Sequence, residues 1–236
     1  MKPRRLVTVA CFFWAACATS PRAGASADCL REFNESFEHF DAVSRHRHLE
    51  GLQRADMECL FAAAKTGEAF NESFLAGPSH TARLQRFIGI NSLAVGRRFE
   101  KHFARLPSGE WYGYNASALG RALESPGFFH VRFDADGSAI FGYADDFVGD
   151  FERQGLTSMF LATPGLEIRA IANNTGNLLF HDLVDTLRRV NPEVAVGTAE
   201  RVADNQRALL SYFMIYRSPA PPPTAFQVDD DLGWHH

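Results

Sequence analysis

The sequence predicts an α+β fold, in which a disulfide-pinned helical N-terminal segment precedes an antiparallel β-barrel of about seven to nine strands. Apolar residues recur at intervals of three and four over residues 28–66, which indicates helices. From Leu106 onward, short segments alternate apolar with polar residues, which indicates strands. Cys29 and Cys59 both lie in the helical part. The strand spacing fits a two-sheet sandwich as well as a barrel.

The first 27 residues have the pattern of a secretory signal peptide. Lys2, Arg4 and Arg5 precede an apolar run over residues 6–18, and Ala25-Ser26-Ala27 fits the small-x-small cleavage pattern. The apolar run would span only about 20 Å as a helix, which is short of the roughly 30 Å hydrocarbon core. We therefore expect a secreted protein without stable membrane insertion, which is extracellular or, in a bacterium, periplasmic.

The charge balance excludes some classes of partner. Cleavage after Ala27 removes four basic residues and no acidic one, so the net charge changes from −4 to −8 with His neutral. Nucleic acids and anionic membrane surfaces are bound by clustered positive charge. We expect no nucleic-acid partner.

The cysteines predict one disulfide. Cys11 and Cys17 lie in the signal, which leaves Cys29 and Cys59 as the only pair in the secreted chain. Closing a loop of about 30 residues stabilises a fold by roughly 3–4 kcal/mol in the chain-entropy model.

Four Asn-x-Ser/Thr sequons begin at Asn34, Asn71, Asn115 and Asn173. In a eukaryotic secretory protein they predict a glycoprotein with all four asparagines on exposed positions. In a bacterial protein they carry no such meaning.

The sequence pattern before residue 106 predicts helices followed by less regular structure. Two helices with a turn near residues 44–48 would bring Cys29 and Cys59 together. Gly and Asn residues predict a long loop over residues 67–81. Residues 88–95 fit a strand, and residues 96–103 fit either a strand or a short helix.

The sequence pattern after residue 106 predicts mainly strands. Alternation over residues 129–133 and 139–143, around the turn sequence 134–137, predicts a hairpin. Further strands are expected at 109–114, 157–163, 166–172, 194–202 and 209–217. The last of these is apolar on both faces, so we expect helices to cover it outside and core or ligand to cover it inside.

Residues 178–190, within this region, predict a helix instead. Leu179, Leu183, Leu187 and Val190 fall on one helical face, and Asn191-Pro192 ends the run. A Pro-rich, acidic tail follows the last strand. The expected organisation is a signal peptide (1–27), a helical segment (28–105), a barrel domain (106–217) and a tail (218–236).

Gly109-Glu110-Trp111-Tyr112-Gly113 opens the strand series with a Gly-x-Trp-x-Gly pattern. This pattern resembles the calycins, which comprise lipocalins, fatty-acid-binding proteins and nitrobindin-like barrels, and it is closest to the last of these. The resemblance covers residues 109–217 and implies a calycin-like barrel in which an Arg of the final strand, here Arg217, packs over Trp111. A C-terminal His placed like the haem ligand of nitrobindin-like proteins is missing, so no cofactor is expected.

These features predict a carrier of a small apolar molecule such as a lipid. Phe is abundant, at 21 residues, and a Phe-lined interior suits apolar ligands. The candidate ligand-binding residues are Trp111, Phe129, Phe141, Phe213 and Arg217.

Two other functions remain open. One is an enzyme that acts on a small lipophilic substrate in the same barrel, with His181 and Asp185 or Glu110 as acid and base. The chain has no nucleophile motif and no metal-ligand spacing, so no catalytic residue is assigned and no metal is expected. The other is a structural secreted glycoprotein without a ligand.

Overall fold

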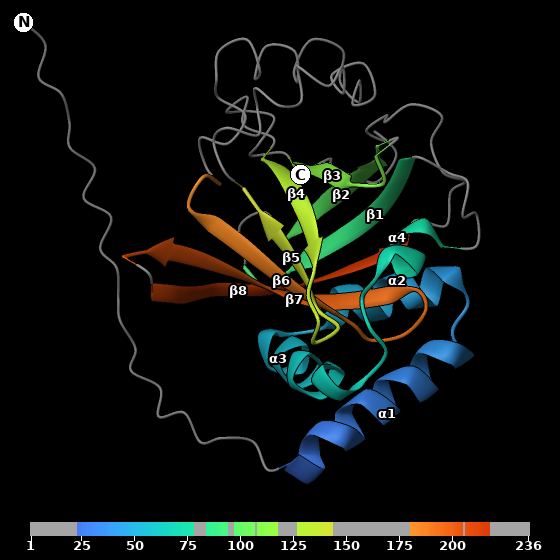
Figure 1. The fold of residues 1–236 in the computed structure, drawn as a ribbon. Helices are drawn as coiled ribbons and strands as arrows, with labels where there is room; N and C mark the ends of the chain where they lie inside the picture. Colours follow the sequence, from blue (N-terminus) through green and yellow to red (C-terminus); the bar gives the residue numbers. More distant parts are fainter. Residues whose placement is uncertain are drawn as a thin grey trace, which may run out of the picture.

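The computed structural model describes residues 23–77, 84–93, 97–106, 108–117, 127–143, 180–204 and 206–217. In this part of the chain, eight strands form a closed antiparallel barrel in which each strand pairs with the next and β8 pairs with β1 (Figure 1). The strands are β1 (Leu84–Asn91), β2 (Arg98–Arg105), β3 (Trp111–Ala116), β4 (Phe128–Phe133), β5 (Ala139–Gly142), β6 (Leu183–Arg189), β7 (Val194–Ala203) and β8 (Gln206–Arg217). The strands expected at 157–163 and 166–172, most of the segment predicted as a signal peptide, and the predicted tail lie outside the described residues.

Residues 28–66 contain helices, but the expected arrangement of two helices with a turn near residues 44–48 is wrong. The helices are α1 (Ala23–His39), α2 (Ala42–Gly51), α3 (Arg54–Ala63) and the short 3-10 helix η1 (Ala64–Thr66). Residues 44–48 lie within α2. This helix begins where it does because the Asp41 carboxylate accepts a hydrogen bond from the Ser44 backbone N–H at 2.7 Å and so caps its N-terminus.

The barrel takes in residues on both sides of the expected domain start at 106. The ambiguous residues before this point form β1 and β2, which pair with each other, and β1 also closes the ring against β8. Inside the region expected as a loop, Glu72–Ala76 forms the short helix α4, whose first turn is capped by Asn71.

The helix predicted over residues 178–190 is wrong, because residues 183–189 form strand β6. Leu183, Asp185 and Leu187 share one face at a period of two, which the helical spacing of the leucines obscured. Strands β5 and β7 pair with β6 on either side, and these tertiary hydrogen bonds override the local helical pattern.

Alternation along the strands separates two apolar cores. Odd-numbered residues of the strands face the interior, where they pack with residues 70–76; the buried members are Phe70, Phe74, Leu75, Ala76, Phe87, Phe103, Trp111, Phe129, Val131, Ala139, Phe141, Tyr143, Leu187, Ala195, Phe213 and Ile215. The second core lies between α1–α3 and the outer faces of β1, β7 and β8 (Figure 1). The prediction that the last strand is covered on both faces is confirmed, since Phe213 lies inside and Met214 lies under the helices.

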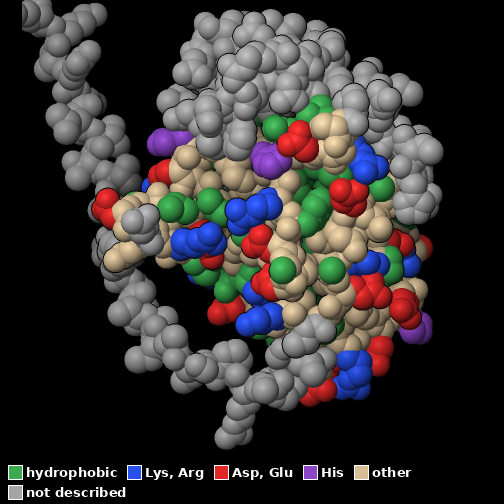
Figure 2. Space-filling model, viewed as in Figure 1, with side chains coloured by type: hydrophobic (Ala, Val, Ile, Leu, Met, Phe, Trp, Pro, Cys, Tyr) green, Lys and Arg blue, Asp and Glu red, His purple; other side chains and the backbone are tan. Residues whose placement is uncertain are grey.

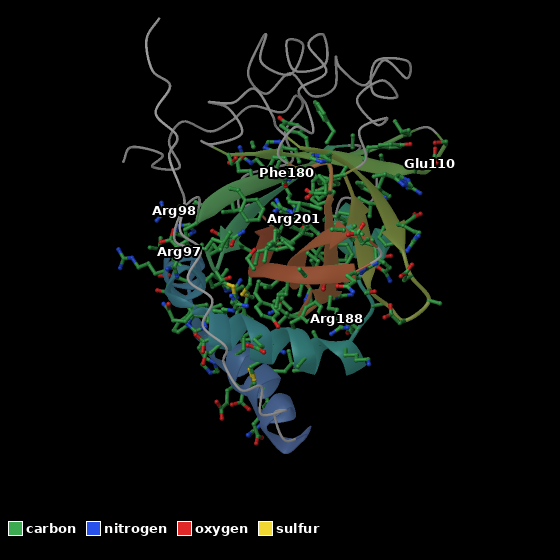
Figure 3. All side chains as sticks on the ribbon, turned by 90° about the vertical axis from the view of Figure 1, so that its left-hand side faces the viewer. Arg97, Arg98, Glu110, Phe180, Arg188 and Arg201 are labelled. Atoms are coloured by element: carbon green, nitrogen blue, oxygen red, sulfur yellow. The ribbon has the colours of Figure 1, made fainter. Side chains whose placement is uncertain are left out.

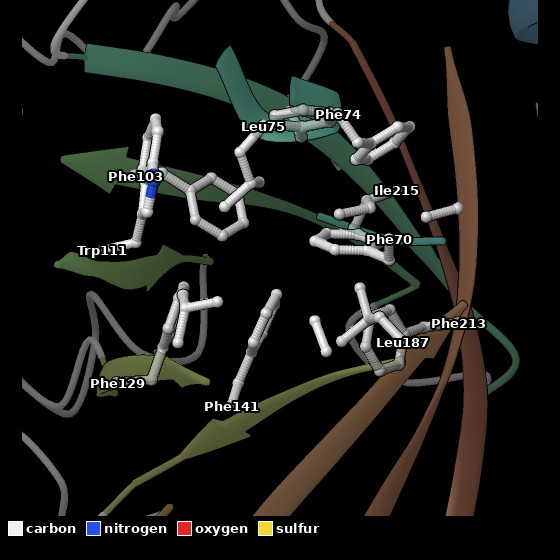
Figure 4. Close-up of a cluster of buried hydrophobic side chains, with 14 of the residues drawn as sticks. Phe70, Phe74, Leu75, Phe103, Trp111, Phe129, Phe141, Leu187, Phe213 and Ile215 are labelled. Carbon is white, nitrogen blue, oxygen red and sulfur yellow. The ribbon is translucent and has the colours of Figure 1, made fainter. Parts of the chain in front are cut away.

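Residues 70–76 close one end of the barrel. Phe70, Phe74 and Leu75 point inward and pack on the interior rings (Figure 4). The Phe70 N–H donates to the Gly137 carbonyl at 2.8 Å, in the turn between β4 and β5. On the opposite side of the ring, the Arg217 guanidinium donates to the Phe74 carbonyl. The segment is therefore fixed to both sides of the opening that it covers.

Three interior glycines are each paired with a phenylalanine on the neighbouring strand. The cross-strand pairs are Gly89 with Phe99, Gly113 with Phe129 and Gly197 with Phe213. A Cβ added at any of the three glycines would overlap the partner's ring, at 2.5 Å for Gly113 and 2.7 Å for Gly197. Each ring therefore occupies the space that a side chain would fill, as in aromatic rescue of a strand glycine.

The two cysteines lie side by side, in α1 and α3, and no disulfide bond joins them. Burial, with a smaller contribution from the hydrogen bond to Cys59, raises the pKa of Cys29 to about 12. The structure thus supplies the proximity that the predicted disulfide requires and does not itself contain the bond.

Gly113→Ala should destabilise the barrel by roughly 1–3 kcal/mol, because the new methyl group overlaps both the Phe129 ring and the His102 carbonyl. Gly142→Ala in β5 is the matched control, since a Cβ there meets nothing within 4 Å. Its free energy of unfolding should stay within about 0.5 kcal/mol of wild type. Urea denaturation followed by circular dichroism measures both values. Equal stabilities of the two variants would contradict the tight Gly113–Phe129 packing.

Candidate functional site

A cluster of four polar side chains lies inside the barrel among aromatic rings. Lys101 comes from β2, Asn115 from β3, Asp185 from β6, and Tyr143 directly follows β5. All four are buried, and Lys101 is 1% exposed. They face inward because they occupy the same odd-numbered positions as the interior phenylalanines. We call them the lysine cluster.

Hydrogen bonds connect every member of the lysine cluster. The Lys101 Nζ donates to Asn115 Oδ1 at 2.8 Å, to Tyr143 Oη at 2.7 Å and to Asp185 Oδ2 at 2.8 Å. The Tyr143 hydroxyl donates to Asp185 Oδ2 at 2.6 Å, and the Asn115 Nδ2 donates to Tyr143 Oη at 3.1 Å. An ammonium group has three protons to donate, so the cluster satisfies Lys101 fully.

Aromatic rings surround the Lys101 ammonium. Its Nζ lies 4.7 Å from the Phe129 ring centroid, and four further rings lie within 6 Å: Phe141 at 5.2 Å, Phe213 at 5.3 Å, Tyr143 at 5.4 Å and Phe99 at 5.7 Å. These are distances at which the negative face of a ring attracts a cation. Phe99, Phe129 and Phe213 are the rings that lie over the interior glycines, so the Gly–Phe pairs also build this cage.

The surroundings shift the protonation of two members of the cluster. Burial lowers the pKa of the Lys101 ammonium, and the charge and hydrogen bond of Asp185 oppose this shift. Burial raises the pKa of the Tyr143 phenol well above its usual value, and the Asp185 carboxylate adds to this rise. Tyr143 is therefore a protonated hydrogen-bond donor at neutral pH.

The lysine cluster lies toward the barrel end opposite α4. Tyr143 follows β5 and Phe180 precedes β6, and their rings stack with centroids 5.6 Å apart. Phe180 is only partly buried, as is Phe99. Gly127, at φ +71°, provides room for the Phe180 ring, because a Cβ there would lie 2.6 Å from it. Phe180 thus packs against the cluster through the Tyr143 ring.

A second buried pair of titratable side chains lies on the outer face of β2 and is separate from the lysine cluster. The His102 Nε2 lies 2.7 Å from Glu100 Oε2, and the His102 ring stacks on Tyr114 at 4.9 Å. Burial lowers the pKa of His102, and Glu100 opposes this. Because even-numbered residues of β2 point away from the interior, this pair does not reach the barrel lumen.

The structure brings together most of the predicted ligand-binding residues. Trp111, Phe129, Phe141 and Phe213 all belong to the interior core. Arg217 lies at the closed end, where it donates to Gln85 Oε1 at 3.1 Å and to α4 carbonyls. The ring under its guanidinium is Phe87, at 4.8 Å, where the resemblance to calycins predicts Trp111. Arg217 therefore holds the end closed.

The predicted acid–base residues are not brought together. His181 lies in an exposed turn before β6, whereas Asp185 is buried in the interior. Glu110 is exposed at the opposite barrel end, at the edge of the molecule in Figure 3, where it accepts a hydrogen bond from Ser108 Oγ at 2.9 Å. The pairing of His181 with Asp185 depended on a helix over 178–190. Instead, His181 lies in the turn before β6 and Asp185 lies inside the strand, so their surroundings differ.

The sequon asparagines that the structure describes differ in their burial and contacts. Asn115 belongs to the lysine cluster and is buried, so a glycan on this asparagine is inconsistent with the structure. Asn34 Oδ1 accepts a hydrogen bond from Asn191 Nδ2 at 3.1 Å, and Asn71 is exposed at the start of α4. Asn173 lies outside the described residues.

Sequence reasoning missed Lys101 and Tyr143. The available signal was the alternation Phe99-x-Lys101-x-Phe103, which places a lysine on the apolar face of a strand. That signal was weak because residues 96–103 fit a helix as well as a strand.

Comparison with known proteins gives no match: no protein-family model matches the chain, and no curated protein matches it significantly. Among the described residues, no three or more His, Cys, Asp or Glu side chains are grouped as metal ligands. None of the helices in the described ranges has the length and apolar character needed to cross a membrane. Acidic and basic side chains are interspersed over the visible face (Figure 2).

Removing one partner of the Lys101–Asp185 ion pair should be costly, whereas removing both should not. Asp185→Leu leaves a buried ammonium without its counter-ion and should lower the free energy of unfolding by about 3–5 kcal/mol. Lys101→Met combined with Asp185→Leu should bring stability back to within about 1 kcal/mol of wild type or above it. Urea denaturation of the single and double variants measures the coupling.

The control is Arg132→Met, which breaks the exposed ion pair of Arg132 with Asp134 and should cost less than about 1 kcal/mol. A double variant as unstable as the single ones would show that the ion pair itself is needed for folding, in contradiction to the prediction.

Proposed function

We propose that the protein is a secreted carrier that binds a small, mainly apolar molecule of the lipid class inside the barrel, with the lysine cluster as its polar anchor. The observation that carries this proposal is one complete polar network, centred on Lys101, in an interior that otherwise consists largely of apolar side chains. Apolar walls with a few convergent polar groups are typical of small-molecule sites.

The energetics support a functional reason for the cluster. Burying a lysine and an aspartate costs desolvation free energy, and apolar residues of similar size give equal or greater stability in many proteins. Titratable groups perturbed by burial and by a specific charged partner occur preferentially at functional sites. Lys101 and Tyr143 both meet that description.

The charge of the cluster favours a neutral polar group on the ligand. Lys101 and Asp185 together carry no net charge when both are ionised. A ligand carboxylate would approach Asp185 as well as Lys101, so attraction and repulsion would largely cancel. A hydroxyl or carbonyl group can exchange hydrogen bonds with Asn115 or Tyr143 without that repulsion. The proposed ligand therefore combines an apolar body with one hydroxyl or carbonyl group.

The neutral fluorophore N-phenyl-1-naphthylamine should bind the mature protein and increase in fluorescence. Ala199→Phe, which adds a ring inside the barrel beside Asp185, should weaken this binding by about tenfold or more, equivalent to 1.4 kcal/mol. Val184→Phe is the matched control, because this β6 residue points outward and pairs with Glu200. The affinity of this variant for the fluorophore should stay within about twofold of the wild-type affinity. Circular dichroism verifies that both variants fold.

Unchanged probe binding by Ala199→Phe would place the probe outside the barrel and contradict the proposal. Native mass spectrometry of the protein purified from its own host gives an independent test. A discrete extra mass that is lost on denaturation supports the carrier function.

The secretion proposal rests on the N-terminal sequence pattern and on the position of the cysteines. In an oxidising compartment we expect Cys29 and Cys59 to form a disulfide, since their thiols are already in contact between α1 and α3. The unreduced mature chain should weigh two hydrogens less than the reduced one, as intact mass spectrometry measures. Cys59→Ser should remove this difference and the roughly 3–4 kcal/mol of stabilisation. An unreduced chain with two alkylatable thiols would contradict this.

For a eukaryotic source, we propose glycans at Asn34 or Asn71, and at Asn173, and none at Asn115, which is buried in the lysine cluster. Glycopeptide mapping separates these positions.

A further inference from the structure

We propose that Lys101 binds the carbonyl carbon of an apolar aldehyde or ketone covalently, as an imine, inside the barrel. This inference rests on the proposed carrier function and narrows its ligand class from hydroxyl or carbonyl compounds to carbonyl compounds. The groups that imine formation requires all lie within hydrogen-bond distance of one another in the lysine cluster.

The first requirement is an amine that loses its proton readily. Lysine amines act as nucleophiles toward carbonyl groups when burial favours the neutral form. Lys101 is 1% exposed, and burial is the largest cause that shifts its pKa downward. Asp185 Oδ2, at 2.8 Å from Nζ, is placed to accept the proton that the ammonium releases.

The second requirement is a proton donor for the carbonyl oxygen. The Tyr143 hydroxyl lies 2.7 Å from Nζ and 2.6 Å from Asp185 Oδ2, so it is adjacent to both the attacking nitrogen and the proton acceptor. Because its pKa is raised, it remains protonated at neutral pH. It can therefore donate a hydrogen bond to a carbonyl oxygen positioned next to Nζ.

Imine formation needs only the carbonyl compound and the groups of the lysine cluster. Asp185 takes one proton from the Lys101 ammonium, and the free amine adds to the carbonyl carbon. A second proton moves from the nitrogen to the former carbonyl oxygen by way of Tyr143, which gives a carbinolamine. Asp185 then returns its proton to the hydroxyl group, the C–O bond breaks, and water leaves. The product is a protonated imine on Lys101, with the ionised Asp185 carboxylate as its counter-ion.

The surroundings suit this product. The iminium carries the same single positive charge as the ammonium it replaces, so the aromatic cage of Phe129, Phe141 and the neighbouring rings still faces a cation. The apolar interior limits the access of water, which would hydrolyse the imine. Lys101 and Asp185 lose and regain their charges together, so no uncompensated buried charge arises.

The chain supplies its own control for the experiment. Its lysines are Lys2, Lys65 and Lys101, and the mature chain lacks Lys2 if cleavage follows Ala27. Lys65, in η1, is exposed to solvent. The folded protein is incubated at pH 7 with 2-naphthaldehyde and sodium cyanoborohydride. Peptide mass spectrometry then locates each amine whose mass has increased by that of the aldehyde less one oxygen atom.

The expected result is that Lys101 is modified at least about tenfold faster than Lys65, although Lys101 is buried, because burial favours the neutral, nucleophilic form of the Lys101 amine. Tyr143→Phe should slow modification of Lys101 by about tenfold or more through loss of the proton donor, while the rate at Lys65 stays unchanged. Lys65→Arg should leave modification of Lys101 unchanged. If Tyr143→Phe does not fold, the wild-type ratio of Lys101 to Lys65 remains the test.

The matched alcohol, 2-naphthalenemethanol, separates this inference from the carrier function. If the alcohol displaces N-phenyl-1-naphthylamine from the barrel and the aldehyde modifies Lys101 preferentially, both are supported. If the alcohol displaces the probe but Lys101 stays unmodified while Lys65 reacts, the imine is overturned and the carrier function stands. If the alcohol does not compete and Lys101 stays unmodified, both are overturned.

Discussion

The closed ring of strands is the constraint on which the rest of the structure depends. Once β8 pairs with β1, every second strand residue must face a small interior that is shut off from water. Lys101 occupies such a position, so its ammonium must find all its acceptors inside the barrel. Asn115, Tyr143 and Asp185 meet that demand from three other parts of the ring. The lysine cluster is thus a direct result of strand register.

The same ring explains the glycines and the shape of the interior. A barrel of eight strands has room for only part of a full set of large inward side chains. Glycine at residues 89, 113 and 197 makes room for Phe99, Phe129 and Phe213, whose rings lie over the opposite backbone and around Lys101. Packing and electrostatics are therefore linked, because the rings that fill the lumen also stabilise its buried cation.

The parts outside the ring have distinct structural tasks. Helices α1–α3 cover β1, β7 and β8, which removes the outer apolar side chains of these strands from water. Residues 70–76 and Arg217 close one end, and the lysine cluster lies toward the other. The proposed ligand site therefore lies away from the end that residues 70–76 close.

The sequence by itself determined the helical character of the N-terminal region, the 129–143 hairpin with Phe129 and Phe141 on one face, and the two-faced burial of the last strand. These features follow from local periodicity, which side-chain hydrophobicity expresses directly. Tertiary structure decided that residues 183–189 form a strand, because pairing with β5 and β7 outweighs a helical spacing of leucines. It also decided that Asn115 is buried and accepts a hydrogen bond from Lys101, and that Asp185 accepts hydrogen bonds from Lys101 and Tyr143. His181, in contrast, lies exposed in a turn. Those contacts join residues up to 84 positions apart, and only the closure of the ring fixes which inward positions meet.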